Sequence, residues 1–167
     1  MEYSVLVIIC MLILSAFFSG MEIAYVSSNK VHLAIEKKQK GFISLILQKI
    51  TKRPSKFIAT MLIGNNIALV IYGFFMGELL MNYINTFQIL ALNGFLALLI
   101  QTIVSTIIIL ITAEFLPKVF FQIYANSLVK FFALPGYIFY VLFSIVSEFV
   151  IWISDQLLKL FFKNFIL

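Results

Sequence analysis

The chain has 167 residues, of which 63% are hydrophobic and 11% charged, and its mean hydropathy is +1.10. A soluble domain of this size could not cover so much apolar surface, so the composition indicates an integral membrane protein. The net charge of +5 could suggest a nucleic-acid partner, but its distribution along the chain is typical of membrane orientation instead. We therefore expect no nucleic-acid partner.

Three apolar segments predict transmembrane helices, at about residues 4–26, 57–81 and 95–125. Each is long enough to cross a hydrocarbon core of about 30 Å at a rise of about 1.5 Å per residue. The N-terminal "MEYS" lacks a basic region, and no small-residue cleavage site follows the first segment. The first segment therefore reads as a retained span rather than a removed signal peptide.

A basic segment at residues 27–56 separates the first two spans, with eight Lys or Arg residues against one acid, Glu36. Its pattern predicts two short amphipathic helices within residues 28–53, broken at Gly41 and stopped before Pro54. The positive-inside rule places this segment in the cytoplasm and the uncharged connector near residue 90 outside. We thus expect a multi-pass protein of the cell's inner (plasma) membrane with its N-terminus outside.

The last segment, at about residues 135–165, carries one thin polar stripe on an otherwise apolar helix. The stripe consists of Ser144, Glu148, Trp152, Asp155, Lys159 and Lys163. Such a helix can lie along the membrane surface as a juxtamembrane belt, or cross as a fourth span with its stripe inside a bundle. A stripe sustained through Lys163 favours the belt helix. Residues 1–167 are accordingly expected to form one all-α integral membrane domain.

Polar residues interrupt all three spans. They are Ser19, Gly20 and Glu22 in the first, Asn65 and Asn66 in the second, and Glu114 with Pro117 in the third. A carboxylate inside a membrane helix costs about 2.5–3.5 kcal/mol on insertion scales, so it usually faces a partner, water or an ion. Counted along the three spans, these groups arrive at similar depth, in the inner half of the bilayer. This coincidence of depth predicts one shared site.

The atoms available at that depth are hard oxygen donors, namely a carboxylate, an amide oxygen, hydroxyls and backbone carbonyls. Such donors suit Mg²⁺, Ca²⁺ or Na⁺, and the absence of clustered His and Cys disfavours zinc or copper. Pro117 has no N–H and cannot donate to the Ala113 carbonyl, which leaves that oxygen beside Glu114 for a cation. The sequence therefore predicts a cation site centred on Glu114.

Structural interpretations stand beside this one. Glu114 could be a protonated carboxyl that hydrogen-bonds Asn65 or Ser105 and only holds helices together. Glu22 could pair with a lysine of the basic segment. Gly73 and Gly77 are more typical of helix packing, and if they mark a face, that face could be a dimer contact. No nucleophile–base pair is visible, so an enzyme is not expected.

Three motifs add a family resemblance. "FFSGMEIAYVSS", "KRPSKFIATMLIGNN" and "AEFLPKVF" resemble the transmembrane domain (DUF21) of CorC/CNNM magnesium transporters, in order and spacing along essentially the whole chain. The resemblance implies three spans, a pair of short cytoplasmic helices, a juxtamembrane belt helix and a homodimer in membrane lipid. It also implies transport of Mg²⁺, with export as the expected direction and Na⁺ as a coupling ion described for bacterial members.

By motif position, the resemblance implies that the metal ligands are Ser19, Gly20, Asn65 and Glu114. It gives supporting roles to Glu22, Ser27, Asn66 and Pro117. Relatives continue into cytosolic CBS domains, so the chain is expected to be a transmembrane piece of a longer protein. Two alternatives remain: a scaffold that transports nothing and serves an envelope or motility complex, and a channel with uncoupled conductance.

Overall fold

The computed structural model describes residues 2–86 and 94–162, and within these ranges the chain forms helices and no strand. The elements in chain order are α1 (Glu2–Ser27), α2 (Lys30–Lys38), α3 (Phe42–Lys52), α4 (Pro54–Thr86), α5 (Gly94–Ile109), the π-helix η1 (Leu110–Phe115), α6 (Leu116–Ile123), α7 (Ala125–Phe131), α8 (Ala133–Leu142) and α9 (Ser144–Phe162). The expected all-α fold class is confirmed.

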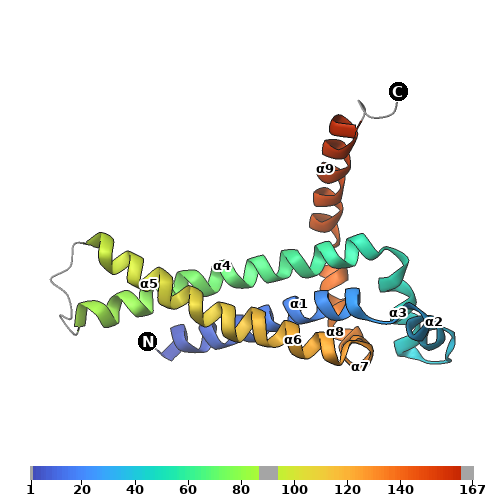
Figure 1. Ribbon diagram of the computed structural model, residues 1–167, viewed down its shortest axis with the longest axis horizontal. Coiled ribbons are helices and arrows are strands. Elements are labelled where there is room, and N and C mark those ends of the chain that lie inside the picture. Colours follow the sequence, from blue (N-terminus) through green and yellow to red (C-terminus); the bar gives the residue numbers. More distant parts are fainter. Residues whose placement is uncertain (1, 87–93, 163–167) are drawn as a thin grey trace.

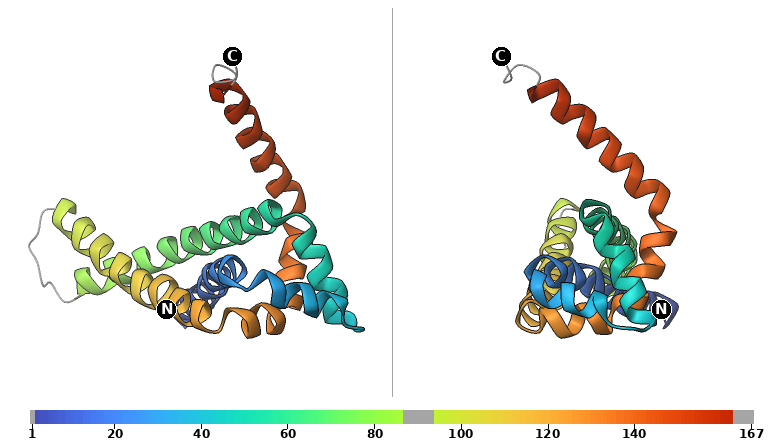
Figure 2. Two further views of the ribbon diagram at one scale, coloured as in Figure 1. Left: turned by 45° about the vertical axis from the view of Figure 1, so that its right-hand side comes forward. Right: turned by 90° about the vertical axis from the view of Figure 1, so that its right-hand side faces the viewer.

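Three helical stretches of the described chain are long and apolar enough to span a membrane: α1, α4, and the α5–η1–α6 run from Gly94 to Ile123. They lie side by side, with α1 and α5–α6 running in one direction and α4 in the other (Figure 1, Figure 2). Helix α4 is longer than the 57–81 expected, because Pro54 serves as its first residue, where a missing N–H costs nothing.

Helix α1 lies at the centre of the bundle and packs against α4, η1, α6 and α7. Glycines make this close packing possible. A Cβ on Gly64 of α4 would lie 2.5 Å from the Phe18 ring, and one on Gly20 of α1 would lie 2.6 Å from the Phe121 ring. Both aromatic rings are buried in the main hydrophobic core. The small residues thus receive the rings that hold the spans together.

The two short helices of the basic segment are present as α2 and α3. Asn29 caps α2 by accepting from the backbone N–H of Val31 at 2.8 Å. Gly41 separates the helices with a φ of +154°, a conformation that favours glycine. Glu36 is buried and pairs with Lys130 at 2.8 Å, which ties α2 to α7.

The expected single helix at about residues 135–165 is instead two helices. Helix α8 begins at Ala133 with Pro135 in its first turn, and α9 follows a break at Phe143. The Ser147 hydroxyl donates to the Phe143 carbonyl at 2.7 Å, a contact that bends helices. Helices α7 and α8 also meet at a bend of 62°, so together they could form one broken fourth span or a re-entrant loop.

Helix α9 leaves the bundle crosswise to the three spans (Figure 1, Figure 2). This is the direction expected of a helix that lies along the membrane surface. The first part of its polar stripe packs on α4, since Nζ of Lys56 donates to the Ser144 hydroxyl and to Oε1 of Glu148, each at 2.6 Å. The later residues Trp152, Asp155 and Lys159 are exposed, and Lys163 lies outside the described residues.

Candidate functional site

The contact between α1 and α4 contains a buried side-chain hydrogen bond. The Ser15 hydroxyl donates to Oδ1 of Asn65 at 2.6 Å, and both residues are buried. An amide oxygen has two lone pairs, so Oδ1 can accept this bond and still face a cation. Sequence reasoning missed Ser15, although its spacing of four from Ser19 places both hydroxyls on one face of α1.

One turn further along α1, the Ser19 hydroxyl is buried without a partner. Ser19 is 1% exposed, and in the described part of the chain its Oγ makes no hydrogen bond. Serines in helices can bond the carbonyl four residues back, so an unpartnered buried hydroxyl needs an explanation. Its lone pairs are free to bind a cation. Gly20 beside it is buried under Phe121.

The third span changes from α-helix to π-helix at the segment that carries Glu114. The Leu116 N–H bonds the carbonyl of Ile111, five residues back, instead of that of Thr112. Pro117 follows with no N–H, so the Thr112 carbonyl has neither its α-helical nor its π-helical donor. The Ala113 carbonyl also lacks its α-helical donor. The Thr112 carbonyl, two residues before Glu114, is therefore open to a ligand, and π-helical turns recur at functional sites.

Helix register places Glu114 at the level of Asn65. Phe121 lies against Gly20, and α1 and α6 run in the same direction (Figure 1). Glu114 is seven residues before Phe121, about 10 Å at 1.5 Å per residue, which corresponds to the level of Ile13 on α1. Asn65 is hydrogen-bonded to Ser15, which lies about half a turn beyond Ile13 on α1. By this register Glu114 lies near the level of the Ser15–Asn65 bond, and about 9 Å along α1 from Ser19.

The Glu114 carboxylate is only partly enclosed. Its side chain is 29% exposed, and Oε2 lies 3.8 Å from Nζ of Lys118 on the next turn. Among the described residues Glu114 makes no hydrogen bond to Asn65 or Ser105. The structure therefore does not show the interhelical hydrogen bond that was considered for a protonated Glu114. Among the described residues no three His, Cys, Asp or Glu side chains cluster as a metal site. The site therefore combines one carboxylate with neutral oxygens.

Of the supporting residues predicted from sequence, Pro117 lies at the site, and the other three lie further out. Asn66 and Ser27 are exposed, and Glu22 is partly buried with no ion pair to the basic segment among the described contacts. Gly77 faces the third span, because a Cβ there would lie 2.7 Å from Nε2 of Gln101. Gly77 therefore packs within this chain, whereas Gly73 is exposed and has no atom within 4 Å of the corresponding position.

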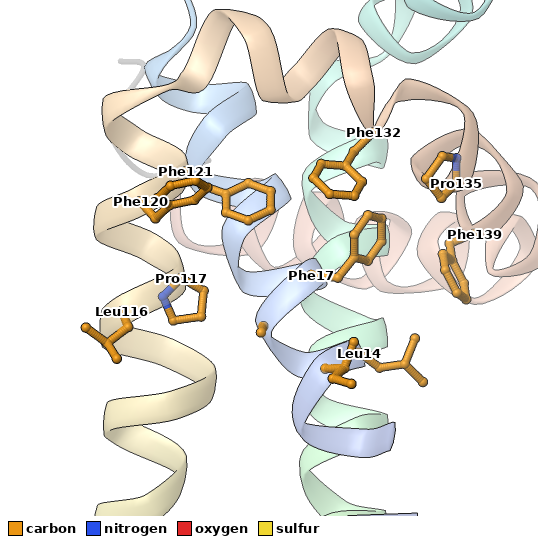
Figure 3. A pocket seen from close by; sticks show the side chains of 11 residues that line it. Leu14, Phe17, Leu116, Pro117, Phe120, Phe121, Phe132, Pro135 and Phe139 are labelled. Atoms are coloured by element: carbon orange, nitrogen blue, oxygen red, sulfur yellow. The ribbon is translucent and has the colours of Figure 1, made fainter. Parts of the chain in front are cut away.

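An apolar cavity of about 610 Å³ opens beside the site, between α1, α6 and α8. Pro117 and Phe121 point across it toward Phe17 of α1 (Figure 3). The face of the third span that carries Pro117 is therefore turned toward α1. Of the two residues whose carbonyls lack an α-helical donor, Ala113 is buried and Thr112 is exposed.

The helices and polar residues described above define a multi-pass, all-α membrane domain with oxygen donors gathered between its spans. Residues 6–164 match the cyclin M transmembrane N-terminal domain, and the chain belongs to this CNNM family. It is also 29% identical over 114 residues to the UPF0053 inner membrane protein YfjD of Escherichia coli (strain K12). That stretch covers 68% of this chain and 24% of the relative, so the chain spans about a quarter of the relative it matches.

Proposed function

We propose that this domain carries divalent cations, with Mg²⁺ as the substrate, across the membrane through the site between α1, α4 and η1. The observation that carries the proposal is the buried, unpartnered Ser19 hydroxyl, one turn from the Ser15–Asn65 hydrogen bond. Membership of the CNNM family supports it. The domain acts as a transporter and not as an enzyme.

The roles follow from the atoms. Glu114 supplies the formal charge, Asn65 and Ser19 supply neutral oxygens, and the π-helix ahead of Pro117 supplies carbonyls. Mg²⁺ requires near-octahedral oxygens at about 2.0–2.1 Å, so a dehydrating site must draw ligands from several spans. Binding therefore involves movement of η1 against α1 and α4, which brings the Glu114 carboxylate away from Lys118.

The finer assignments rest on the resemblance of the motifs. We propose export as the direction, Na⁺ as the coupling ion, a homodimer as the working unit, and cytosolic CBS domains in the full-length protein. The name of the Escherichia coli relative supports placement in the inner membrane. The basic residues 27–56 support a cytoplasmic position for α2 and α3, and hence an external N-terminus.

Flux measurements in proteoliposomes test the proposal. Glu114→Gln should abolish Mg²⁺ flux while the dimer remains folded, whereas Glu78→Gln, an exposed acid of α4, should leave flux unchanged. Wild-type flux in Glu114→Gln would refute the role of Glu114. Calorimetric titration of the purified dimer with Mg²⁺, against Mn²⁺, Ca²⁺ and Na⁺ as competitors, tests cation choice.

The Glu114–Lys118 ion pair favours a second candidate, a membrane scaffold for an envelope or motility complex. In that case Glu114 only neutralises Lys118 within the third span. Glu114→Gln would then lower the thermal stability or partner binding. Any change of melting temperature on adding a cation would be the same in the wild type and in Glu114→Gln.

A further inference from the structure

A second cavity, of about 390 Å³ and lined by polar residues, lies where α4 begins and α9 leaves the bundle. Its lining differs from the apolar cavity beside Pro117, because it brings together two cations, two acids and an indole. These residues are Arg53, Lys56, Glu148, Asp155 and Trp152. Opposite charges gathered around one cavity can either satisfy each other or bind a ligand that carries both signs.

Lys56 is satisfied by the protein itself. Its Nζ donates to the Ser144 hydroxyl at 2.6 Å and to Oε1 of Glu148 at 2.6 Å, and it lies 5.1 Å from the centre of the Tyr140 ring. The side chain is 8% exposed. Lys56 therefore anchors α9 to α4, and its burial leaves the ammonium little exposed to a ligand.

Arg53 is different. Its side chain is 65% exposed and makes one ion pair within the described residues, from Nη1 to Oε1 of Glu148 at 3.3 Å. A guanidinium carries five N–H donors in a planar fork that matches two phosphate oxygens. Most of these donors remain available at the mouth of the cavity, so Arg53 presents an anion-binding group there.

Asp155 and Trp152 form the opposite end. They follow Glu148 by seven and four residues on α9, which places all three on one face of the helix. Both are exposed, and Asp155 makes no ion pair with any described residue. A carboxylate beside an indole ring is suited to an alkylammonium group. Both Glu148 contacts use Oε1, which leaves Oε2 as a second acceptor.

We propose that this cavity binds the headgroup of a zwitterionic phospholipid with a primary ammonium, the phosphate on Arg53 and the ammonium between Asp155 and Glu148 beside Trp152. Charge complementarity at the two ends carries the assignment. A phosphoglycerol headgroup would leave Asp155 unpaired, and a quaternary ammonium would offer its carboxylate no N–H donor. This proposal goes beyond cation transport and does not depend on it.

The position of the cavity favours a lipid over a soluble molecule with the same headgroup. Helix α9 runs crosswise to the spans (Figure 2). Its apolar residues Phe149, Ile153 and Leu157 are exposed. Such a helix is expected at the membrane surface, with its tryptophan at headgroup depth. The cavity on its flank then meets phospholipid headgroups and lies within reach of their acyl chains.

Native mass spectrometry of the purified full chain tests the proposal. The protein is released from nanodiscs that contain phosphatidylethanolamine, phosphatidylglycerol and phosphatidylcholine with identical acyl chains. We expect phosphatidylethanolamine to be retained about tenfold over the other two, because a charge-assisted contact is lost in each competitor. Asp155→Asn should remove this preference, and Arg53→Gln should lower retention of the bound lipid, whereas Lys52→Gln, an exposed neighbouring cation, should change neither.

Melting temperatures in lipid-free detergent test whether the Asp155→Asn variant is folded, as its exposed position predicts. Equal retention of the three lipids by the wild type would overturn the proposal, as would an unchanged preference in folded Asp155→Asn. Soluble glycerophosphoethanolamine, which has the same headgroup without acyl chains, is added as a competitor in a further experiment. Displacement of the lipid by this compound at equal concentration would show a soluble ligand and overturn the assignment to a lipid.

Discussion

Ser15 of α1 and Asn65 of α4, fifty residues apart in the sequence, share a buried hydrogen bond of 2.6 Å from hydroxyl to amide oxygen. The bond fixes the side chain of the predicted ligand Asn65 before any cation arrives. It also reaches the turn of α1 that precedes the unpartnered Ser19 hydroxyl. Ser15 thus acts on the proposed site through Asn65.

We therefore predict that Ser15→Ala weakens Mg²⁺ binding about tenfold, the effect typical of removing a group that orients a metal ligand. The free energy of unfolding should fall by about 1 kcal/mol, the usual net value of one hydrogen bond. Titration calorimetry and detergent melting measure the two effects. Thr102→Ala, which removes an exposed hydroxyl of α5, is the control, and equal affinities in the two variants would contradict the prediction.

Pro117→Ala should restore a backbone N–H to the third span after η1. We expect the free energy of unfolding to rise by about 1 kcal/mol, because a carbonyl beside Glu114 regains a hydrogen bond. Mg²⁺ flux should fall, because that carbonyl is no longer free for a ligand. Pro135→Ala, in the first turn of α8, provides the control because its N–H is not needed there. Full flux in Pro117→Ala would remove the proline from the mechanism.

The close contact between α1 and α6 predicts a steric effect at Gly20. A Cβ there would lie 2.6 Å from the Phe121 ring, so Gly20→Ala should destabilise the protein by about 1–3 kcal/mol through overpacking. Gly73 of α4 is exposed, and a Cβ there would have no atom within 4 Å. Gly73→Ala should therefore stabilise the protein by up to about 1 kcal/mol through helix propensity. Thermal melts in one detergent would show opposite signs, and two shifts of equal sign would disprove the packing argument.

Glu148 predicts a dependence of stability on pH. The hydrogen bond from Lys56, and then its charge, hold the pKa of the Glu148 carboxyl below its ordinary value of 4.5. Because the folded pKa is lowered, this contribution to stability is complete above the ordinary pKa and is lost as the pH falls through the folded pKa.

Glu148→Gln should therefore lower the melting temperature near pH 7, with a difference from wild type that shrinks as the pH falls below about 4.5. Thermal melts of both proteins in detergent across pH 3–7 measure this difference in melting temperature. Glu78→Gln, at the far end of α4, should show no such convergence. A difference that stays constant with pH would mean that Glu148 stabilises the protein without its charge.

The sequence by itself determined the all-α fold class and the approximate position of three long apolar helices. Span length follows from the length of an apolar run, and helix ends follow from residues such as Gly41 and Pro54, which are local properties of the chain. The polar residues at one depth of the three spans could also be found, because depth is counted along each helix. Ser19, Asn65 and Glu114 were predicted in this way to belong to one site.

Only the tertiary structure decided which of these groups meet. The partner of Asn65 depends on how α1 and α4 rotate against each other, and the sequence did not predict the α-to-π change at Leu110–Phe115. The crosswise course of α9, and the contact of its Glu148 with Lys56 of α4, are likewise seen only in the folded chain. A hydropathy pattern is the same for every rotation of a helix about its axis, so contacts between spans appear only once all of them are packed.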